Sequence, residues 1–196
     1  MKATKIFFSI LLLTPFLYAK EFIVNSKNSK ANFQLMYQKS KVIDGSFQDI
    51  TGLIIFDEKE NIIKSLQGSV DTDSVTTQNK DLTALIIGEK ILNNKKYPEI
   101  EFNADKITDD KVFGDIKING VKRNIEFDIV NSGVFLDKLY ISMNTTLKRS
   151  NFDLSWDVLD SLGSSAVSND IKVTINMEAT LQNELNFQQT KEKRKK

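Results

Sequence analysis

The segment IKVTINMEA, residues 171–179, alternates apolar and polar side chains along its whole length. Its odd-numbered positions, from Ile171 to Ala179, are apolar, and lysine, threonine, asparagine and glutamate lie between them. Because successive side chains of a strand point to opposite faces, this period of two predicts a strand with one buried face and one face in water. One-sided strands of this kind are typical of antiparallel sheets.

The same alternation recurs along most of the chain, in segments separated by short turns such as DEKEN at 57–61 and NGVKR at 119–123. About eight antiparallel strands can bury a common apolar face by closing into a barrel, which also removes exposed edges. We therefore predict an all-β, eight-stranded antiparallel barrel. Its other seven strands are expected at 31–37, 52–56, 66–70, 100–104, 112–118, 125–129 and 139–149.

One segment has a helical period instead. In NKDLTALIIGEKIL, residues 79–92, apolar residues fall at 82, 85, 86 and 92, which predicts a short helix at one end of the barrel. Asn79 or Asp81 is a suitable N-cap, and for Asp81 we favour this role over a polar contact at the barrel mouth. Gly88 within the helix would cost about 1 kcal/mol of helix propensity.

The first 19 residues are typical of a secretory signal peptide: two lysines, an apolar run at 6–17 and the small-residue cleavage pattern Leu-Tyr-Ala. This run is shorter than the roughly 20 residues of a membrane span. The alternative is an uncleaved amphipathic anchor. We predict export, with residues 1–19 as signal peptide, 20–181 as the barrel domain and 182–196 as a polar, basic tail.

Composition restricts the chemistry. The chain has 27 basic and 26 acidic residues, and the last six residues, KEKRKK, hold five of the positive charges, so no basic field for nucleic acid exists outside the tail. Without histidine or cysteine, Ser-His and Cys-His nucleophile pairs and the usual zinc ligand sets are excluded. Asp71 and Asp73 begin like a calcium loop, but Thr76 and Leu82 stand where it needs glycine and glutamate. We expect no cofactor, no metal and no catalytic residue.

The inward register also carries small residues, which would leave an apolar space in the lumen. A barrel of eight strands is wide enough either to be filled by side chains or to hold one small ligand. The alternative is that the glycines permit strand bends at barrel corners. An outer-membrane barrel has the same alternation but would need aromatic girdles at its strand ends. The small inward residues are Ala31, Gly52, Gly68, Ala104, Gly114, Thr145 and Ala179.

Several stretches together resemble the YceI-like, lipocalin-like family of periplasmic polyisoprenoid-binding proteins. GSFQDITGLIIFD is similar to the family run Gly-x-Phe-x-x-Phe-x-Gly-x-Ile-x-Phe-Asp, and YPEIEF to Tyr-Pro-x-Ile-x-Phe. The resemblance continues in NSKNSKANFQL, SVDTDSVTTQNKDL, VFGDIKINGVKRNIEFDI and TLKRSNFDL, in the family's order and spacing.

This resemblance implies an extended eight-stranded, lipocalin-like barrel with a helix near one end, which holds a long apolar chain in its lumen. The chain departs from the family pattern where a ligand head group would lie. Asn28-Ser29 replaces His-Ser, Lys80-Asp81 replaces Arg-Asp, and Asp153 replaces the glycine after Phe152. These changes concern head-group preference more than the barrel itself.

Candidate ligand contacts are the large apolar residues of the inward face, three helix residues at the rim, and two residues of special type. Gly114 would leave space in the lumen. Arg149 continues the inward register and could hold a polar head group, with an internal ion pair or a lid stacked on Trp156 as alternatives. The candidates are Phe33, Leu35, Ile54, Phe56, Leu85, Ile86, Leu92, Phe102, Gly114, Ile116, Phe127, Ile141, Met143, Leu147 and Arg149.

Three functional hypotheses follow. The first is a periplasmic protein, not an enzyme, that carries or sequesters a polyisoprenoid, an isoprenoid quinone or a fatty-acid derivative. The second is a filled barrel that serves as a structural or interaction module, with a basic tail that docks to an anionic membrane or a partner. The third is a lipid hydrolase or isomerase that works through carboxylates. Transient membrane contact and association of two barrels remain open.

Overall fold

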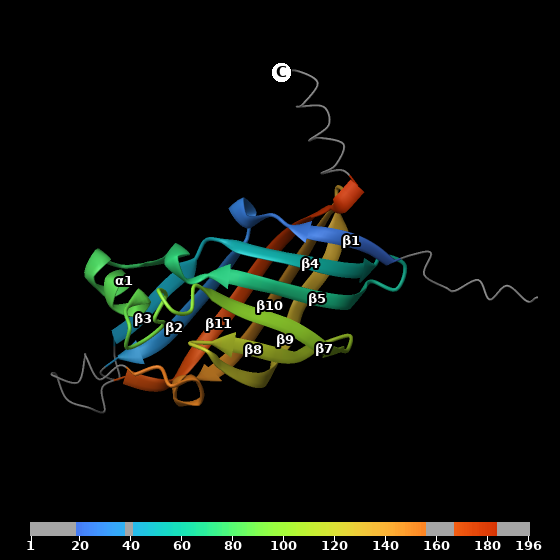
Figure 1. Cartoon of the computed structure of the whole chain (residues 1–196). Helices are drawn as coiled ribbons and strands as arrows, with labels where there is room; N and C mark the ends of the chain where they lie inside the picture. Colours follow the sequence, from blue (N-terminus) through green and yellow to red (C-terminus); the bar gives the residue numbers. More distant parts are fainter. Residues whose placement is uncertain (1–18, 38–40, 156–166, 184–196) are drawn as a thin grey trace, which may run out of the picture.

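The computed structural model describes residues 19–37, 41–155 and 167–183. Most of this part of the chain is strand (Figure 1). The strands are β1 (Ala19–Val24), β2 (Lys30–Tyr37), β3 (Lys41–Phe47), β4 (Ile50–Asp57), β5 (Ile62–Asp71), β6 (Val75–Thr77), β7 (Glu99–Ile107), β8 (Lys111–Ile118), β9 (Val121–Phe135), β10 (Lys138–Lys148) and β11 (Val167–Leu181).

The strands form a closed antiparallel barrel. Neighbours follow the order β1-β4-β5-β7-β8-β9-β10-β11, and β1 closes the ring by pairing with β11, where Phe22 lies opposite Leu181 and Val24 opposite Ala179. The remaining segments β2, β3 and β6 extend the wall beyond β1, β4 and β5, so the barrel has eight strands of which three are broken. The predicted all-β, eight-stranded antiparallel barrel is therefore confirmed.

The three breaks lie side by side and are joined by hydrogen bonds. Ser26, between β1 and β2, donates its hydroxyl to Asp49 Oδ1 at 2.7 Å, between β3 and β4. Asp71 N donates to Asp49 O at 3.0 Å, and Gln48 N donates to Ser74 Oγ at 3.2 Å, which ties in the break between β5 and β6. The strands predicted at 31–37, 52–56 and 66–70 correspond to β2, β4 and β5, and β1, β3 and β6 were missed in the sequence analysis.

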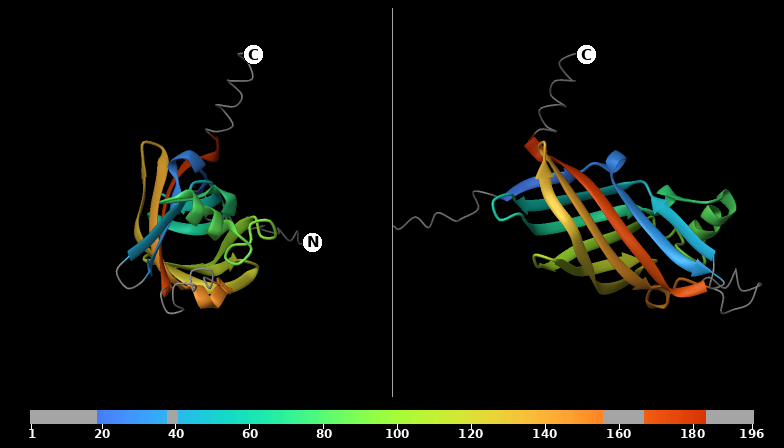
Figure 2. Two further views of the ribbon diagram at one scale, coloured as in Figure 1. Left: turned by 90° about the vertical axis from the view of Figure 1, so that its left-hand side faces the viewer. Right: turned by 180° about the vertical axis from the view of Figure 1, so that it is seen from behind.

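The barrel has two different ends (Figures 1 and 2). The helix end carries α1 (Lys80–Ile87) and the turn between β8 and β9, where Asn119 and Gly120 have positive φ. The hairpin end carries the turn between β9 and β10, at Leu136 and Asp137. No helix among the described residues is long and apolar enough to cross a membrane.

The predicted helix is correct in place but too long. Asn79 is the N-cap, and its side chain accepts a hydrogen bond from Leu82 N at 2.8 Å. Asp81 lies in the first turn, so its predicted role as a cap is wrong. The helix ends at Gly88, whose N–H bonds Leu85 O, because a glycine costs less at a helix end than in the interior. Leu92 lies beyond the helix.

The predicted signal peptide and basic tail lie outside the described residues, apart from Ala19, which opens β1, and Gln182 and Asn183, which follow β11. Trp156 also lies outside them.

Candidate ligand-binding cavity

The helix half of the barrel contains a cavity of about 150 Å³. Its wall is almost entirely aliphatic and aromatic, and none of the described lining residues is charged. The apolar lining side chains are Val24, Ala31, Phe33, Leu35, Phe47, Ile50, Ile54, Leu66, Val70, Ile86, Ile91, Leu92, Ile100, Phe102, Ile116, Ile118, Phe127, Met143, Leu147, Phe152, Leu154, Ile171, Val173, Ile175 and Met177.

The hairpin half of the lumen is filled by side chains. Phe22 of β1 and Phe56 of β4 are 1% and 0% exposed, and their rings meet edge to face. Val112, Leu139 and Ala179 close the same half and are all 0% exposed. None of these five residues lines the cavity, so this half forms a floor and leaves the helix half as the binding space.

Half-buried residues in the inward register mark the empty space in the lumen. Ile100, Phe102, Val173 and Ile175 all line the cavity, and yet each keeps intermediate exposure. At the floor, by contrast, inward residues are fully buried. An empty apolar space is poorly suited to water, because water there lacks the two to four polar partners that a stable site needs.

The cavity is covered at the helix end by α1 and the chain that follows it. Ile86 of α1 is 3% exposed, and Ile91 and Leu92 behind the helix are 2% and 5% exposed. Leu92 N bonds Ile86 O at 3.0 Å, so the chain turns back onto the helix and returns both apolar side chains to the lumen. The predicted rim residues Ile86 and Leu92 thus share one wall although the helix stops between them.

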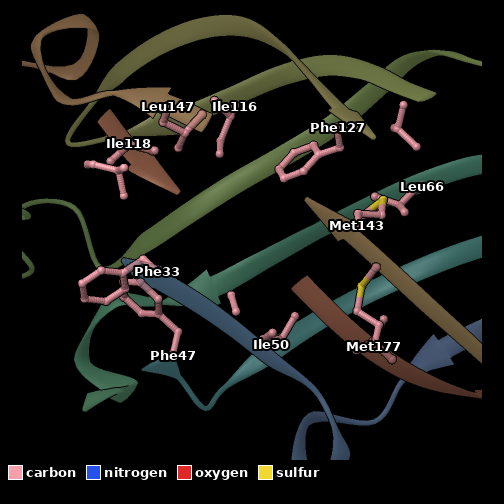
Figure 3. Packing of buried hydrophobic residues seen from close by; sticks show 14 of the residues in the cluster. Phe33, Phe47, Ile50, Leu66, Ile116, Ile118, Phe127, Met143, Leu147 and Met177 are labelled. Carbon is pink, nitrogen blue, oxygen red and sulfur yellow. The ribbon is translucent and has the colours of Figure 1, made fainter. Parts of the chain in front are cut away.

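Two methionines lie above the floor. Met143 of β10 and Met177 of β11 point into the interior and line the cavity together with Leu66, Phe33 and Phe47 (Figure 3). Met143 is 1% exposed and Met177 8%. Methionine has three flexible torsions, so these side chains can change rotamer to fit an irregular apolar ligand.

Ten of the fifteen sequence-predicted site residues line this cavity. They come from six strands and from the cover at the helix end, and the structure brings them together around one space. Contact of these residues with a ligand stays a prediction. They are Phe33, Leu35, Ile54, Ile86, Leu92, Phe102, Ile116, Phe127, Met143 and Leu147.

The other five predicted residues do not line the cavity. Phe56 and Ile141 belong to the filled half, where alternation gives the same inward direction but neighbouring side chains leave no space. Leu85 lies half-buried on α1. Gly114 and Arg149 were predicted to face the lumen, and the backbone geometry around each of them explains why they do not line it.

Gly114 allows β7 and β8 to approach closely and does not leave space in the lumen. A Cβ at this position would lie 2.3 Å from Asn103 O and 2.8 Å from the Cα of Ala104, its partner on β7. Gly52 and Gly68 are likewise paired across β4 and β5, and a Cβ on Gly68 would lie 2.6 Å from Thr51 O. Gly52, Gly68 and Ala31 do border the cavity, whereas Ala104, Gly114, Thr145 and Ala179 do not. The set of small residues therefore predicted the lumen only in part.

Arg149 opens a short 3-10 turn, Arg149–Phe152, because β10 ends at Lys148. Its Nη1 donates to Leu154 O at 3.4 Å, and its buried Nε has no hydrogen-bond partner among the described residues. No ion pair joins Arg149 to an aspartate in this part of the chain, so the side chain acts on the backbone of the turn that brings Phe152 and Leu154 to the cavity.

Sequence reasoning missed several lining residues. Ile171, Val173, Ile175 and Met177 stood in the inward register of the clearest strand, and the alternation was sufficient to include them. Phe152 and Leu154, by contrast, reach the cavity from the turn after β10, where no period of two applies. The same holds for Ile91 behind α1.

A partly buried electrostatic cluster lies outside the lumen, where β10 and β11 meet the first break. Glu178 Oε1 accepts hydrogen bonds from Lys138 Nζ at 2.6 Å, Asn28 Nδ2 at 2.8 Å and Asn25 Nδ2 at 3.2 Å. The contact with Lys138 and the two amides hold the pKa of the Glu178 carboxyl below its ordinary value, against the effect of burial, and Glu178 raises the pKa of Lys138. Glu178 N donates to Ser29 Oγ at 3.1 Å. This network fastens the closing strands.

Acidic groups are scattered elsewhere. Asp71 Oδ1 accepts from Asp73 N at 2.8 Å, which makes the pair a turn cap. Within residues 19–37, 41–155 and 167–183, no group of three or more acidic side chains is arranged to hold a metal ion.

Solved structures share this barrel. BcnA from Burkholderia cenocepacia superposes with a TM-score of 0.69 at 19% identity, over 80% of this chain and 99% of that protein. A polyisoprenoid binding domain from Saccharophagus degradans gives a TM-score of 0.64 at 12% identity, over 82% and 98%. The YCEI protein of Campylobacter jejuni gives 0.58 at 27% identity, over 68% and 82%.

Sequence comparison leads to the same group. Protein YceI of Escherichia coli O157:H7 is 26% identical over 101 residues, which is 50% of this chain and 53% of that protein. Protein YceI of Salmonella newport is 23% identical over 126 residues, 61% and 66% of the two chains. The match thus spans about half to two thirds of these relatives. Residues 22–179 match the model of the YceI-like domain, and the chain belongs to the YceI-like family.

Proposed function

We propose that this protein is an exported, periplasmic lipid-binding protein that carries or sequesters a long apolar ligand in the helix half of its barrel. The ligand class is a polyisoprenoid, an isoprenoid quinone or a fatty-acid derivative. The observation that carries the proposal is the apolar cavity above a filled floor, with no charged residue in its described lining. The Saccharophagus degradans neighbour, a polyisoprenoid binding domain, supports the same ligand class.

The geometry suggests how a long chain would enter. The cavity of about 150 Å³ is smaller than typical ligand pockets of about 300–1,000 Å³. An extended ligand therefore needs more room than the cavity itself offers. We infer that Met143 and Met177 change rotamer to make room for the ligand. The rest of the ligand would extend out of the lumen past α1, where Ile86, Ile91 and Leu92 form the cover.

The binding energy needs no catalytic group. Transfer of an alkyl chain from water into an apolar site stabilises it by roughly 0.8 kcal/mol per CH₂, so eight buried carbons contribute about 6 kcal/mol before ordering costs. Burial of an apolar chain is therefore sufficient to explain ligand binding at this site. The signal-peptide pattern at residues 1–19 supports export.

A second candidate, the filled barrel used as a structural or interaction module, is favoured by the small cavity volume. The two are separated by mass spectrometry of organic extracts from natively purified protein. A long-chain lipid near one per protein supports the carrier, whereas its absence supports the module.

A matched pair of variants locates the ligand. Val173→Phe adds volume to the cavity wall, and Val130→Phe makes the same change on β9, where Val130 is 57% exposed. We expect Val173→Phe to lower the lipid content at least tenfold and Val130→Phe to leave it unchanged. Equal lipid content in both folded variants would contradict a lumenal site.

A further inference from the structure

The tip of the β9–β10 hairpin exposes two large apolar side chains. Phe135 is 67% exposed and Leu136 is 77% exposed, the highest values among the large apolar residues of the described chain. Tyr140, on the same hairpin, is 39% exposed. Single exposed apolar residues are normal on a protein surface, but adjacent ones at a tip form a patch that calls for a partner.

Leu136 in this turn has a left-handed backbone conformation that leucine disfavours. Leu136 and Asp137 both have positive φ, 49° and 63°, as a two-residue hairpin turn of this hand requires. Glycine and asparagine adopt that conformation readily, whereas a bulky residue is strained in it. Folding alone would favour asparagine at position 136, so the leucine points to a role in contact rather than in the turn.

The hairpin projects from the barrel. Strand β8 pairs with β9 only as far as Asp128, opposite Lys111, while β9 continues to Phe135 and pairs there with β10 alone on the described chain. On the open side, Asn61 Nδ2 donates to Ser132 O at 3.5 Å, short of the tip. Phe135 and Leu136 therefore lie on a convex projection, which fits a deformable surface better than a rigid groove.

The last described strand ends beside the hairpin tip. Lys138, directly after the tip, lies opposite Thr180, and β11 ends at Leu181 (Figure 1). The sequence that follows ends in KEKRKK, with five positive charges and one negative. Lys138 itself is already paired, because its Nζ bonds Glu178 Oε1 at 2.6 Å.

We propose that the β9–β10 hairpin tip is a membrane-docking element, in which Phe135 and Leu136 insert into the interface of a phospholipid bilayer, and the positive charge of the KEKRKK sequence favours an anionic bilayer. A short apolar insertion and a polybasic segment are each weak membrane anchors, and the two together give reversible binding. This inference does not rest on a ligand in the lumen.

The test uses sedimentation of the exported full chain with vesicles of phosphatidylcholine alone or mixed with phosphatidylglycerol, after intact mass has fixed the N-terminus. Leu136→Asn and Phe135→Ser are each expected to weaken binding to mixed vesicles roughly tenfold. The matched controls are Met36→Gln and Val42→Thr, which remove apolar side chains 42% and 46% exposed far from the tip. Both controls should bind as the unmodified chain does.

Thermal unfolding separates docking from a structural role. Leu136→Asn relieves the turn, so its melting temperature should rise by about 2–4 °C while vesicle binding falls. Removal of residues 191–196 should weaken binding to mixed vesicles and leave binding to phosphatidylcholine unchanged. A fall in both melting temperature and binding for Leu136→Asn would overturn the proposal.

The absence of native cysteine allows a direct probe. An environment-sensitive fluorophore on Leu136→Cys should shift to the blue with mixed vesicles, and the same label on Val42→Cys should not. Equal shifts at both sites, or no vesicle binding by the unmodified chain, would overturn the proposal. Concentration-dependent self-association lost in Leu136→Asn, without vesicle binding, would assign the tip to a second copy of the chain instead.

Discussion

Phe22 and Phe56 meet edge to face across β1 and β4, with ring centroids 6.5 Å apart and ring planes at 85°. The pair fills the hairpin half of the lumen, so it sets where the cavity stops. Edge-to-face pairs of this kind add about 0.5–1.5 kcal/mol to the effect of burial. The floor is thus both the most completely buried part of the barrel and the boundary of its candidate site.

Phe56→Ala should destabilise the barrel by about 3–5 kcal/mol, because it removes a fully buried ring and leaves a void. Denaturant unfolding measures this change, with Phe135→Ala, at an exposed position, as the control expected within about 0.5 kcal/mol. The void should also extend the cavity toward the hairpin end and admit longer ligands. A loss below about 1 kcal/mol would show that the floor is not well packed.

Gly114 provides a second test, because its lack of a side chain allows β7 and β8 to approach closely. A Cβ there would lie 2.3 Å from Asn103 O, so Gly114→Ala must push β7 and β8 apart and should destabilise the protein by about 1–3 kcal/mol. Gly133→Ala is the matched control, since its Cβ would have only Asn61 Oδ1 nearby, at 3.6 Å. The control should be neutral or slightly stabilising. Equal unfolding free energies for the two variants would contradict the close approach of β7 and β8.

The number of strands, their direction and much of the lumen wall could be predicted because they depend on local alternation. Ile54 and Phe56 show the limit of that signal: both alternate inward on β4, but only Ile54 lines the cavity. Whether a position is wall or floor depends on the volume of side chains from distant strands, such as Phe22. No period within one segment contains that information.

The end of α1 shows the same limit for helices. Apolar spacing continued to Leu92, and the structure does bury Leu92, but by a turn behind Gly88 rather than by a longer helix. Hydrophobic pattern predicts which side chains are buried more reliably than the backbone path that buries them. Phe152 and Leu154 were missed for the related reason that the turn holding them has no period.

The Glu178 network predicts a pH dependence of stability. Because the folded state holds the pKa of Glu178 below its ordinary value, the network stabilises the fold fully above the ordinary glutamate pKa of roughly 4.3, and this stabilisation is lost as pH falls through the folded-state pKa. Glu178→Gln should flatten the acid limb of the stability profile measured by chemical unfolding. The outcome that opposes this account is an acid limb of unchanged slope.

At neutral pH the same variant should lose about 1–3 kcal/mol, because the hydrogen bond from Lys138 loses its charged acceptor. Lys138 also has a raised pKa, so its contribution is present below the ordinary lysine value and declines as pH rises through the folded-state value. Glu58→Gln is a suitable control, since Glu58 and Lys20 form an exposed ion pair that is expected to contribute less than about 1 kcal/mol.

Asn79→Ala should loosen the cover of the cavity without unfolding the barrel. The Asn79 side chain caps α1 through Leu82 N, and loss of such a cap costs about 1 kcal/mol. An eight-residue helix has little stability of its own, so α1 depends on this cap and on the burial of Ile86. Hydrogen exchange should show faster opening of the α1 amides, roughly fivefold, with β10 and β11 unchanged. Asp81→Asn keeps the cap and serves as control.

If ligand passes the helix, Asn79→Ala should also speed the release of a bound fluorescent fatty acid, whereas an unchanged release rate with a loosened helix would place the exit elsewhere.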